Sequence, residues 1–268
     1  MPILHIAVLA LVQGITEFLP ISSTAHLILV PALTGWPDQG LTIDVAVHVG
    51  TLGAVMLYLR RDLWAMAQGL AQLAKGRRNP MATLFGYLVI GTVPVVIAGF
   101  LLDRYAPGAL RSVTVIAWAT LGFGVVLWIG DRLGMTVRRI EHLKLSDVAI
   151  IGLAQVLALI PGTSRAGVTV TAARFLGLER PDSARFSMLL SIPVIVGAGS
   201  LKGFDLYQAG NAQLTADAVI AAGLAFVAAL VAIVAMMAWL RRASFTPFVV
   251  YRIVFGGVLL AIVYGFVG

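Results

Sequence analysis

A short stretch near the start of the chain gathers residue types that can bind a cation. Residues 13–26 read QGITEFLPISSTAH, in which Gln13 and Glu17 stand four apart and therefore lie on one face of a helix. A carboxylate with a side-chain amide oxygen beside it suits a hard divalent cation, Mg²⁺ or Ca²⁺. Burying a charge in an apolar chain is costly, so we predict a functional role for Glu17 rather than a structural one.

The same stretch places two serines and a histidine just after a proline. Ser22 or Ser23 can begin a new helix after Pro20, with free backbone N–H groups at its start. His26 follows three or four residues later, within reach of either hydroxyl, and a histidine beside a serine can activate it as a nucleophile. The alternative is that the serines only cap the half-helix and His26 only hydrogen-bonds a neighbour.

A second stretch has the residues of an anion site. Residues 161–169 read PGTSRAGVT, and Arg165 offers a planar fork of donors that matches phosphate oxygens. Backbone N–H groups at a helix start, with the helix dipole behind them, also favour an anion. The expected phosphate cradle consists of Gly162, Thr163, Ser164 and Thr169. The alternative is an arginine that only neutralises Glu17 or Asp44.

Asp44 and His48 form a third candidate pair, also four residues apart. They could complete the shell of a metal, orient His26, or only neutralise each other. Together the three segments offer a metal-binding carboxylate, a hydroxyl beside a histidine and a phosphate cradle, which are the parts of a phosphoryl-transfer site.

The composition indicates where such a site must lie. Of the 268 residues, 60% are hydrophobic and only 12% are charged, against about 25% charged in soluble domains. This excludes a soluble enzyme, a disordered chain and a disulfide scaffold, and the absence of cysteine excludes thiolate chemistry. The net charge of +7 then reports membrane topology rather than nucleic-acid binding.

Six stretches are long and apolar enough to cross a bilayer as helices. They are residues 41–60, 82–102, 112–130, 184–202, 216–240 and 247–267. Two further apolar regions, 2–33 and 146–178, are each broken by a proline among small polar residues, so we expect two half-helices joined by a turn within the membrane. Region 2–33 is not expected to be a signal peptide. A signal peptide begins with basic residues, and the first Lys or Arg of this chain is Arg60.

The basic residues set the expected orientation. Five follow the first span, four follow the third, three precede the fourth and two follow the fifth, so fourteen fall on one side. The other side has only Arg104, Arg111 and Lys202. The richer side is predicted to be cytoplasmic, with both termini outside. Arg252, near a span end, is expected to reach back to the cytoplasmic surface.

The two broken regions resemble each other. A glutamine precedes each proline (Gln13 before Pro20, Gln155 before Pro161), and Ser23 and Ser164 each follow by three residues. Opposed half-helices of this kind occur in inverted-repeat transporters. We therefore predict one all-α polytopic membrane domain over residues 1–268, with six transmembrane helices and two re-entrant regions related by an inverted repeat.

Residues 13–26 and 161–165 closely resemble the two signature motifs of the undecaprenyl-pyrophosphate phosphatases of the membrane-integral, bacitracin-resistance type. The resemblance covers essentially the whole chain. It implies a metal-dependent enzyme of the bacterial inner membrane, with its site facing the periplasm, that hydrolyses undecaprenyl diphosphate to the monophosphate and phosphate and so recycles the carrier of cell-wall synthesis. Bacitracin would compete only indirectly by sequestering this lipid, no nucleic acid is expected, and a homodimer is an open option.

The resemblance also implies roles for single residues. Glu17 and Gln13 match the metal-binding E/Q-x-x-x-E motif, Ser23 and His26 match the nucleophile and its proton-transfer partner, and Arg165 lies in the phosphate motif. Ser164, Arg165 and Thr169 match the phosphate-binding motif. From their residue types and positions, Ser22, Gly162 and Thr163 are assigned to the same phosphate-binding set, and Asp44 and His48 are supporting candidates. Gln13 replaces a glutamate, Ala166 replaces a serine, and His48 stands where a glutamine is usual.

Two other functions fit parts of the pattern. A lipid-phosphate flippase or anion transporter would explain the inverted repeat and the broken helices. An ion channel or structural membrane protein fits less well, because a pore does not require serine, histidine, glutamate and arginine to meet at one point. Phosphate release from a polyprenyl diphosphate separates these functions.

Overall fold

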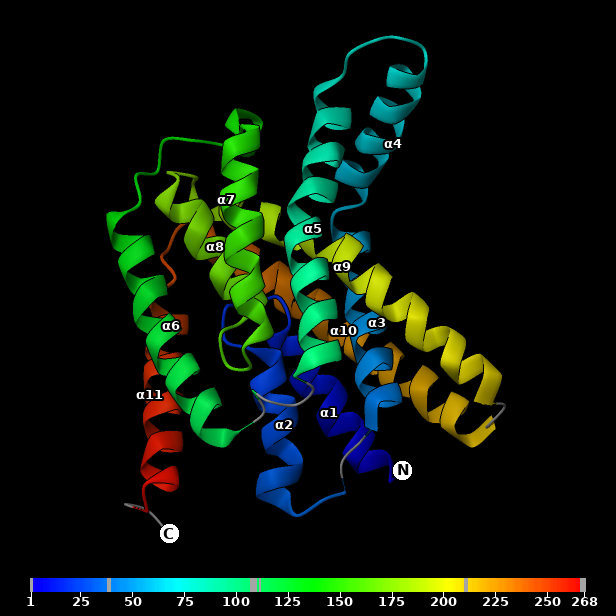
Figure 1. The fold of residues 1–268 in the computed structure, drawn as a ribbon, viewed down its shortest axis with the longest axis vertical. Coiled ribbons are helices and arrows are strands. Elements are labelled where there is room, and N and C mark those ends of the chain that lie inside the picture. The colour runs from blue at the N-terminus through cyan, green and yellow to red at the C-terminus, as the bar shows by residue number, and fades with distance from the viewer. Residues whose placement is uncertain (1, 38–39, 107–109, 111, 210–211, 266–268) are drawn as a thin grey trace.

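The computed structural model describes residues 2–37, 40–106, 110, 112–209 and 212–265, of which 32, 33, 41, 198–209 and 212–214 are described by their backbone alone. The regular elements in this part of the chain are helices (Figure 1). They are α1 (Ile3–Thr16), α2 (Ser23–Thr34), α3 (Gly40–Tyr58), α4 (Arg60–Ala74), α5 (Pro80–Tyr105), α6 (Val113–Leu133), η1 (Ile140–His142), α7 (Leu145–Gln155), η2 (Val156–Leu159), α8 (Arg165–Phe175), α9 (Arg180–Ala209), α10 (Ala212–Leu240) and α11 (Thr246–Val263).

The helices account for the apolar composition. Four described helices are long and apolar enough to cross a membrane, namely α5, α6, α11 and residues Thr215–Leu240 of α10. The α3–α4 pair passes the same test as one span bent by 76°. The chain is therefore a multi-pass membrane protein. Each of the six predicted spans corresponds to a helix (α3, α5, α6, α9, α10 and α11), whereas helix α4 was not predicted.

Both predicted helix breaks are present. α1 ends at Thr16 and α2 begins at Ser23, while α7 and η2 end before Pro161 and α8 begins at Arg165. In Figure 1, α1 rises from the lower end of the molecule to its middle and α2 returns downward. α7 descends from the upper end to the middle and α8 returns upward (Figure 1). The two breaks therefore meet near the middle of the molecule.

The residue before each second half-helix has an unusual backbone. Ser22 (φ 76°) and Ser164 (φ 71°) are the only non-glycine residues with positive φ in the described part of the chain. Both are N-cap residues, of α2 and α8 respectively. A serine held in the left-handed region costs about 1–3 kcal/mol, and such strain concentrates at functional sites. By backbone conformation, Ser164 is therefore the structural equivalent of Ser22. The spacing from the prolines had instead suggested that it was equivalent to Ser23.

Small residues let the helices around the breaks pack closely. A Cβ on Gly50 of α3 would lie 2.1 Å from the Ala222 carbonyl oxygen of α10, and one on Gly14 of α1 would lie 2.6 Å from Ala228 Cβ. α10 therefore packs closely against both α1 and α3, which hold the first polar segment. Close approach through small residues is the usual packing of membrane helices.

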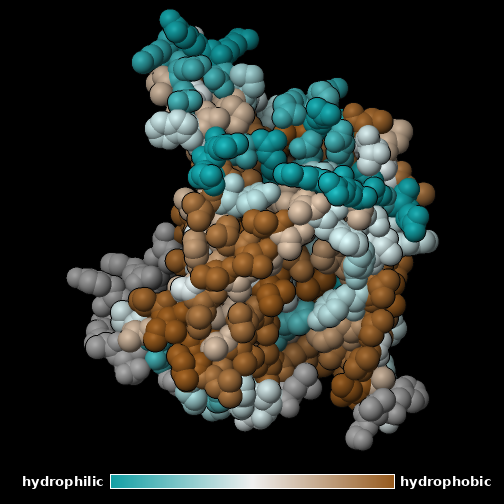
Figure 2. All heavy atoms as spheres, turned by 180° about the vertical axis from the view of Figure 1, so that it is seen from behind, coloured by the Kyte–Doolittle hydropathy of each residue, from teal (hydrophilic) through white to brown (hydrophobic). Residues whose placement is uncertain are grey.

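On the face shown in Figure 2, hydrophilic residues gather at the end of the molecule that carries α4, which Figure 1 labels. There Arg138 donates a hydrogen bond of 2.5 Å to Asp147, which also accepts from the Lys144 backbone N–H. Burial alone would raise the pKa of Asp147, but these donors hold it below its usual range. Arg111 lies outside the described residues and the Lys202 side chain is not described, so the predicted sparse side is represented by Arg104.

Candidate active site

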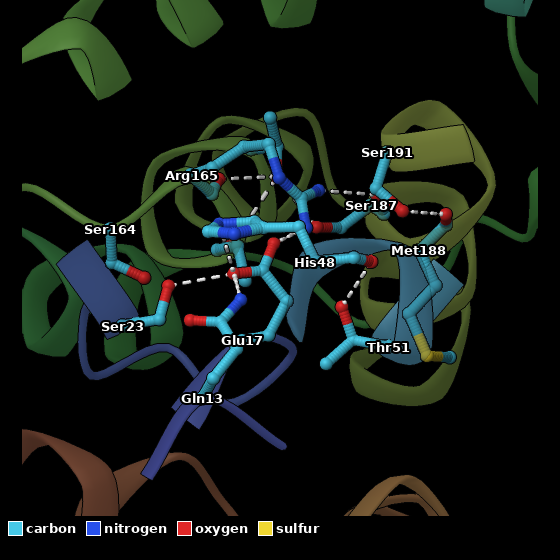
Figure 3. Close-up of polar contacts among 12 residues, drawn as sticks. Gln13, Glu17, Ser23, His48, Thr51, Ser164, Arg165, Ser187, Met188 and Ser191 are labelled. Atoms are coloured by element: carbon cyan, nitrogen blue, oxygen red, sulfur yellow. Dashed lines mark hydrogen bonds and ion pairs between the residues drawn. The ribbon is translucent and has the colours of Figure 1, made fainter. Parts of the chain in front are cut away.

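The carboxylate of Glu17 is the centre of a polar cluster where the first break meets α3 and α8 (Figure 3). Its Oε1 accepts a hydrogen bond of 3.0 Å from Arg165 Nη2. Its Oε2 accepts from Ser23 Oγ at 2.7 Å and from Gln13 Nε2 at 2.9 Å. His48 Nε2 lies 3.6 Å from the same Oε2. Predicted site residues from α1, α2, α3 and α8 thus converge on one buried carboxylate.

Arg165 joins this cluster at the start of α8. Besides Glu17, its guanidinium donates to the Ser187 carbonyl oxygen of α9 at 3.2 Å and lies 5.9 Å from the centre of the Phe18 ring. The side chain is 14% exposed and lines a cavity. The ion pair with Glu17 that was the alternative to anion binding is therefore present, but the arginine still faces the cavity.

The cavity has a volume of about 350 Å³ and lies between the two breaks. Its polar wall consists of Glu17, Ser22, Ser23, Thr24, Asp44, His48, Ser164 and Arg165. Its apolar wall comes from α5, α9 and the segment before Pro161, including Val95, Ile160 and Val194. Small-molecule pockets are roughly 300–1,000 Å³, so this one accommodates a small polar group beside an apolar one.

His26 is directed away from Ser23. Its Nδ1 lies 2.7 Å from the Ser22 carbonyl oxygen, and its Nε2 lies 2.5 Å from the Tyr251 hydroxyl of α11. The ring stacks on Phe255 with a centroid separation of 4.7 Å. Both ring nitrogens are therefore occupied, and the group that accepts the Ser23 hydrogen bond is Glu17.

The predicted phosphate cradle divides into two parts. Ser164 lines the cavity, and its hydroxyl oxygen accepts from the Gly167 N–H at 3.0 Å, which caps α8. Thr169 is fully buried and bonds to the Arg165 carbonyl and the Ser187 hydroxyl, so it supports Arg165 from behind. Gly162 and Thr163 lie in the turn behind this wall. A Cβ on Gly162 (φ +96°) would lie 2.5 Å from the Ile116 carbonyl oxygen, so the turn requires glycine.

Few side chains in the site could act as ligands of a cation. Among the described residues no three His, Asp, Glu or Cys side chains form a group suited to a metal ion. Glu17 supplies one carboxylate, and Gln13 supplies an amide whose Oε1 is buried and has no hydrogen-bond partner in the described part of the chain. The unpartnered Gln13 Oε1 beside the Glu17 carboxylate gives two protein ligands for a cation, and oxygens of the substrate would supply the others.

Comparison with known proteins identifies the family. A family model described as Bacitracin resistance protein BacA matches residues 6–258. The chain belongs to this family. A curated relative, Undecaprenyl-diphosphatase 1 of Rhodospirillum rubrum, is 55% identical over 271 residues, which cover 98% of this chain and 96% of that protein. The Undecaprenyl-diphosphatase of Ruegeria pomeroyi is 52% identical over 98% of this chain and 100% of that protein. The resemblance inferred from the two motifs is confirmed.

The prediction that Arg252 reaches the cytoplasmic surface is wrong for this BacA-family chain. The side chain is fully buried. Its guanidinium donates to the carbonyl oxygens of Pro20 at 3.1 Å and Gly162 at 2.9 Å, one in each break. Two more bonds go to Thr120 and Ala119 of α6. A guanidinium with five donors can satisfy several carbonyls at once, so Arg252 joins the two breaks to α6.

Sequence reasoning also missed Ser187 and Tyr251. Ser187 holds Arg165 through its carbonyl oxygen, and Tyr251 binds His26. Neither residue is unusual for its position in an apolar helix, so the sequence carries no signal for them. Arg252 did carry a signal, namely a charge within a predicted span, which normally marks a buried functional or structural residue.

Proposed function

We propose that this protein hydrolyses undecaprenyl diphosphate to undecaprenyl phosphate and inorganic phosphate. The observation that carries the proposal is the contact among Glu17, Ser23 and Arg165, which unites a carboxylate, a hydroxyl and a guanidinium on one cavity wall. The BacA family and the relatives named Undecaprenyl-diphosphatase supply the substrate.

The cavity separates the two ends of such a lipid. About 350 Å³ holds a diphosphate but not a long polyprenyl chain, which must continue along the apolar wall toward the bilayer. Val95 and Val194 lie on that wall, and Arg165 lines the same cavity. A charged head group would thus be drawn into the polar pocket while its tail stays in the hydrocarbon.

Arg165 is placed to bind the transferred phosphoryl group. Its guanidinium has five N–H donors, and the contacts to Glu17 and the Ser187 carbonyl engage one terminal nitrogen each. The remaining donors, together with the start of α8, would stabilise negative charge as the transition state forms. Removing one such donor typically lowers kcat by about 10²–10³.

Ser23 is the proposed nucleophile. Its hydroxyl lines the cavity and donates to Glu17 Oε2 at 2.7 Å, so an acceptor for its proton is already in place. We assign His26 a supporting role. Because its Nδ1 binds the Ser22 carbonyl, it holds the left-handed turn that presents Ser23. Trapping a phosphoserine would support this nucleophile, whereas full turnover by Ser23→Ala would assign the attack to water.

A divalent cation, Mg²⁺ or Ca²⁺, is proposed as the cofactor. Glu17 and the Gln13 amide oxygen would hold it together with phosphate oxygens of the substrate. The cation would neutralise phosphate charge.

We further propose six membrane spans and two re-entrant regions related by an inverted repeat, in the bacterial inner membrane. In support, α1 and α2 enter from the end opposite to α4, and α7 and α8 enter from the α4 end (Figure 1). Lys75, Arg77 and Arg78 lie at the α4 end, which the positive-inside rule makes cytoplasmic. The first break then opens toward the periplasm. Bacitracin would act indirectly, by sequestering the lipid substrate.

Phosphate release from a polyprenyl diphosphate by the purified protein tests the function. Glu17→Gln and Arg165→Met should each lower kcat at least about 100-fold, because each removes a charge that acts in the transition state. Arg61→Met, at an exposed position outside the cavity, is the matched control and should retain activity. Substrate-driven lipid transport by wild type without phosphate release would instead assign the chain to the transporters.

A further inference from the structure

The His48 ring is held in one orientation by the backbone of its own helix. Its Nδ1 lies 2.6 Å from the Asp44 carbonyl oxygen, which can only accept, so Nδ1 carries a proton. In a neutral imidazole the lone pair then lies on Nε2. Nε2 is directed at Glu17 from the cavity wall (Figure 3). A histidine whose other nitrogen donates to a backbone carbonyl is the common form of a metal ligand.

The spacing between His48 and Glu17 is slightly longer than that of two ligands of one ion. Nε2 and Oε2 are 3.6 Å apart, which is too long for a hydrogen bond. Bonds of about 2.0–2.2 Å to a shared cation place neighbouring N and O ligands roughly 3–3.5 Å apart. A lone pair facing a carboxylate oxygen is repelled, whereas a cation between the two atoms attracts both.

A third donor completes the set without disturbing Arg165. The Gln13 amide touches the same Oε2 through Nε2 at 2.9 Å, and its buried Oε1 lacks a partner among the described residues. A half-turn of this amide would bring Oε1 to the cation. Arg165 meanwhile binds the other oxygen, Oε1 of Glu17, so the ion pair and the cation can exist together.

We propose that His48 is a nitrogen ligand of the divalent cation at Glu17, with the Gln13 amide oxygen as a third protein ligand. The inference rests on the proposed function and deepens it, because it names a ligand at the cation site proposed there and shifts the preferred ion from Mg²⁺ or Ca²⁺ toward a transition-metal ion. An imidazole favours transition-metal ions, whereas Mg²⁺ and Ca²⁺ take oxygen ligands. This chain should therefore bind Mn²⁺ more tightly than Ca²⁺. His26 is not a ligand, because both of its ring nitrogens are already bonded.

Mn²⁺ alone, bound to the purified full chain, is the probe. Electron paramagnetic resonance gives its affinity, and pulsed measurements detect nitrogen directly coordinated to the ion. We expect ¹⁴N modulation in wild type, and labelling with ¹⁵N-histidine should convert it to the ¹⁵N pattern without any substitution. His48→Gln should abolish the modulation and weaken Mn²⁺ binding at least about 10-fold, with Ca²⁺ affinity, measured by competition, changing less.

Two matched histidine variants sharpen the test. His26→Gln, in the site but turned away, and His142→Gln, at an exposed position in η1, should both keep the nitrogen signal. No nitrogen coupling in wild type, or coupling that persists in His48→Gln, would overturn the inference. Phosphate release by wild type is scored separately. Release without nitrogen coupling refutes the ligand alone, and coupling without release refutes the proposed hydrolysis alone.

Discussion

Replacing Arg252 by methionine tests whether one buried side chain holds both helix breaks. The four carbonyl oxygens that it binds differ in whether they keep another hydrogen-bond donor when the guanidinium is removed. The carbonyls of Ala119 and Thr120 lie within α6 and keep their helical N–H donors. Those of Pro20 and Gly162 lie in the breaks, where Arg252 is their principal donor. The variant therefore leaves two buried carbonyls short of a donor.

The expected cost follows from these two groups. An unsatisfied buried polar group costs about 1–3 kcal/mol, so we expect Arg252→Met to lose about 3 kcal/mol of unfolding free energy. For a domain of this size that lowers Tm on the order of 10 °C. A displacement of about 1 Å between reacting groups costs about 100-fold in rate, so kcat should fall by about that factor when the breaks separate.

Thermal unfolding and phosphate release on the same detergent-purified samples measure both effects. Arg252→Lys keeps the charge, but its single nitrogen cannot span both breaks, so it should fall between wild type and Arg252→Met. Arg242→Met removes an exposed arginine and serves as the control. Replacing buried charges by apolar residues is sometimes neutral. If Arg252→Met kept its Tm within about 2 °C and its kcat within twofold of wild type, Arg252 would not hold the two breaks together.

Three further outcomes are expected. Ser23→Ala should release phosphate at no more than about 1% of the wild-type rate, because it removes the proposed nucleophile but leaves the Glu17–Arg165 ion pair intact. A single-turnover assay measures this rate, and a thermal melt of the same sample is the folding control. Gly162→Ala should lower Tm, with a loss of at least about 1–3 kcal/mol, because its φ of +96° and the Ile116 carbonyl both oppose a Cβ. The lowered pKa of Asp147 stabilises the fold above its unfolded pKa of about 4, and this stability is lost as pH falls through the folded value. Asp147→Asn should therefore unfold at a lower temperature than wild type at pH 7, and the difference between the two melting temperatures should shrink as the pH falls below the unfolded pKa of about 4.

Much of the fold was predictable because membrane helices obey simple rules. Helix α5 and its neighbours follow from the length of apolar runs, and both breaks follow from Pro20 and Pro161. α4 was not predictable in this way, because its apolar residues are interrupted by polar ones over Arg60–Ala74 and it carries no span signal. The pairing of Ser164 with Ser22 was also not predictable, since it depends on backbone angles that spacing does not specify.

The candidate site was predictable in its membership but not in its contacts. Glu17, Ser23, His48 and Arg165 were all chosen from residue type, and all line one cavity. The predicted contact between Ser23 and His26 does not occur in this structure, where Ser23 binds Glu17 and His26 binds Tyr251. Helical spacing allows side chains three or four residues apart to meet, but packing decides which partner each one takes.

The sequence by itself determined that the chain lies in a membrane and where its helices break, and it predicted which few polar residues form the candidate site. It could do so because burying a charge or a broken backbone in hydrocarbon is costly, so each exception is visible against an apolar background. Only the tertiary structure decided that Arg252 joins the two breaks, and that His48 and Arg165 approach opposite oxygens of Glu17. Those contacts join residues up to 232 positions apart, and their geometry arises from helix packing that no local pattern encodes.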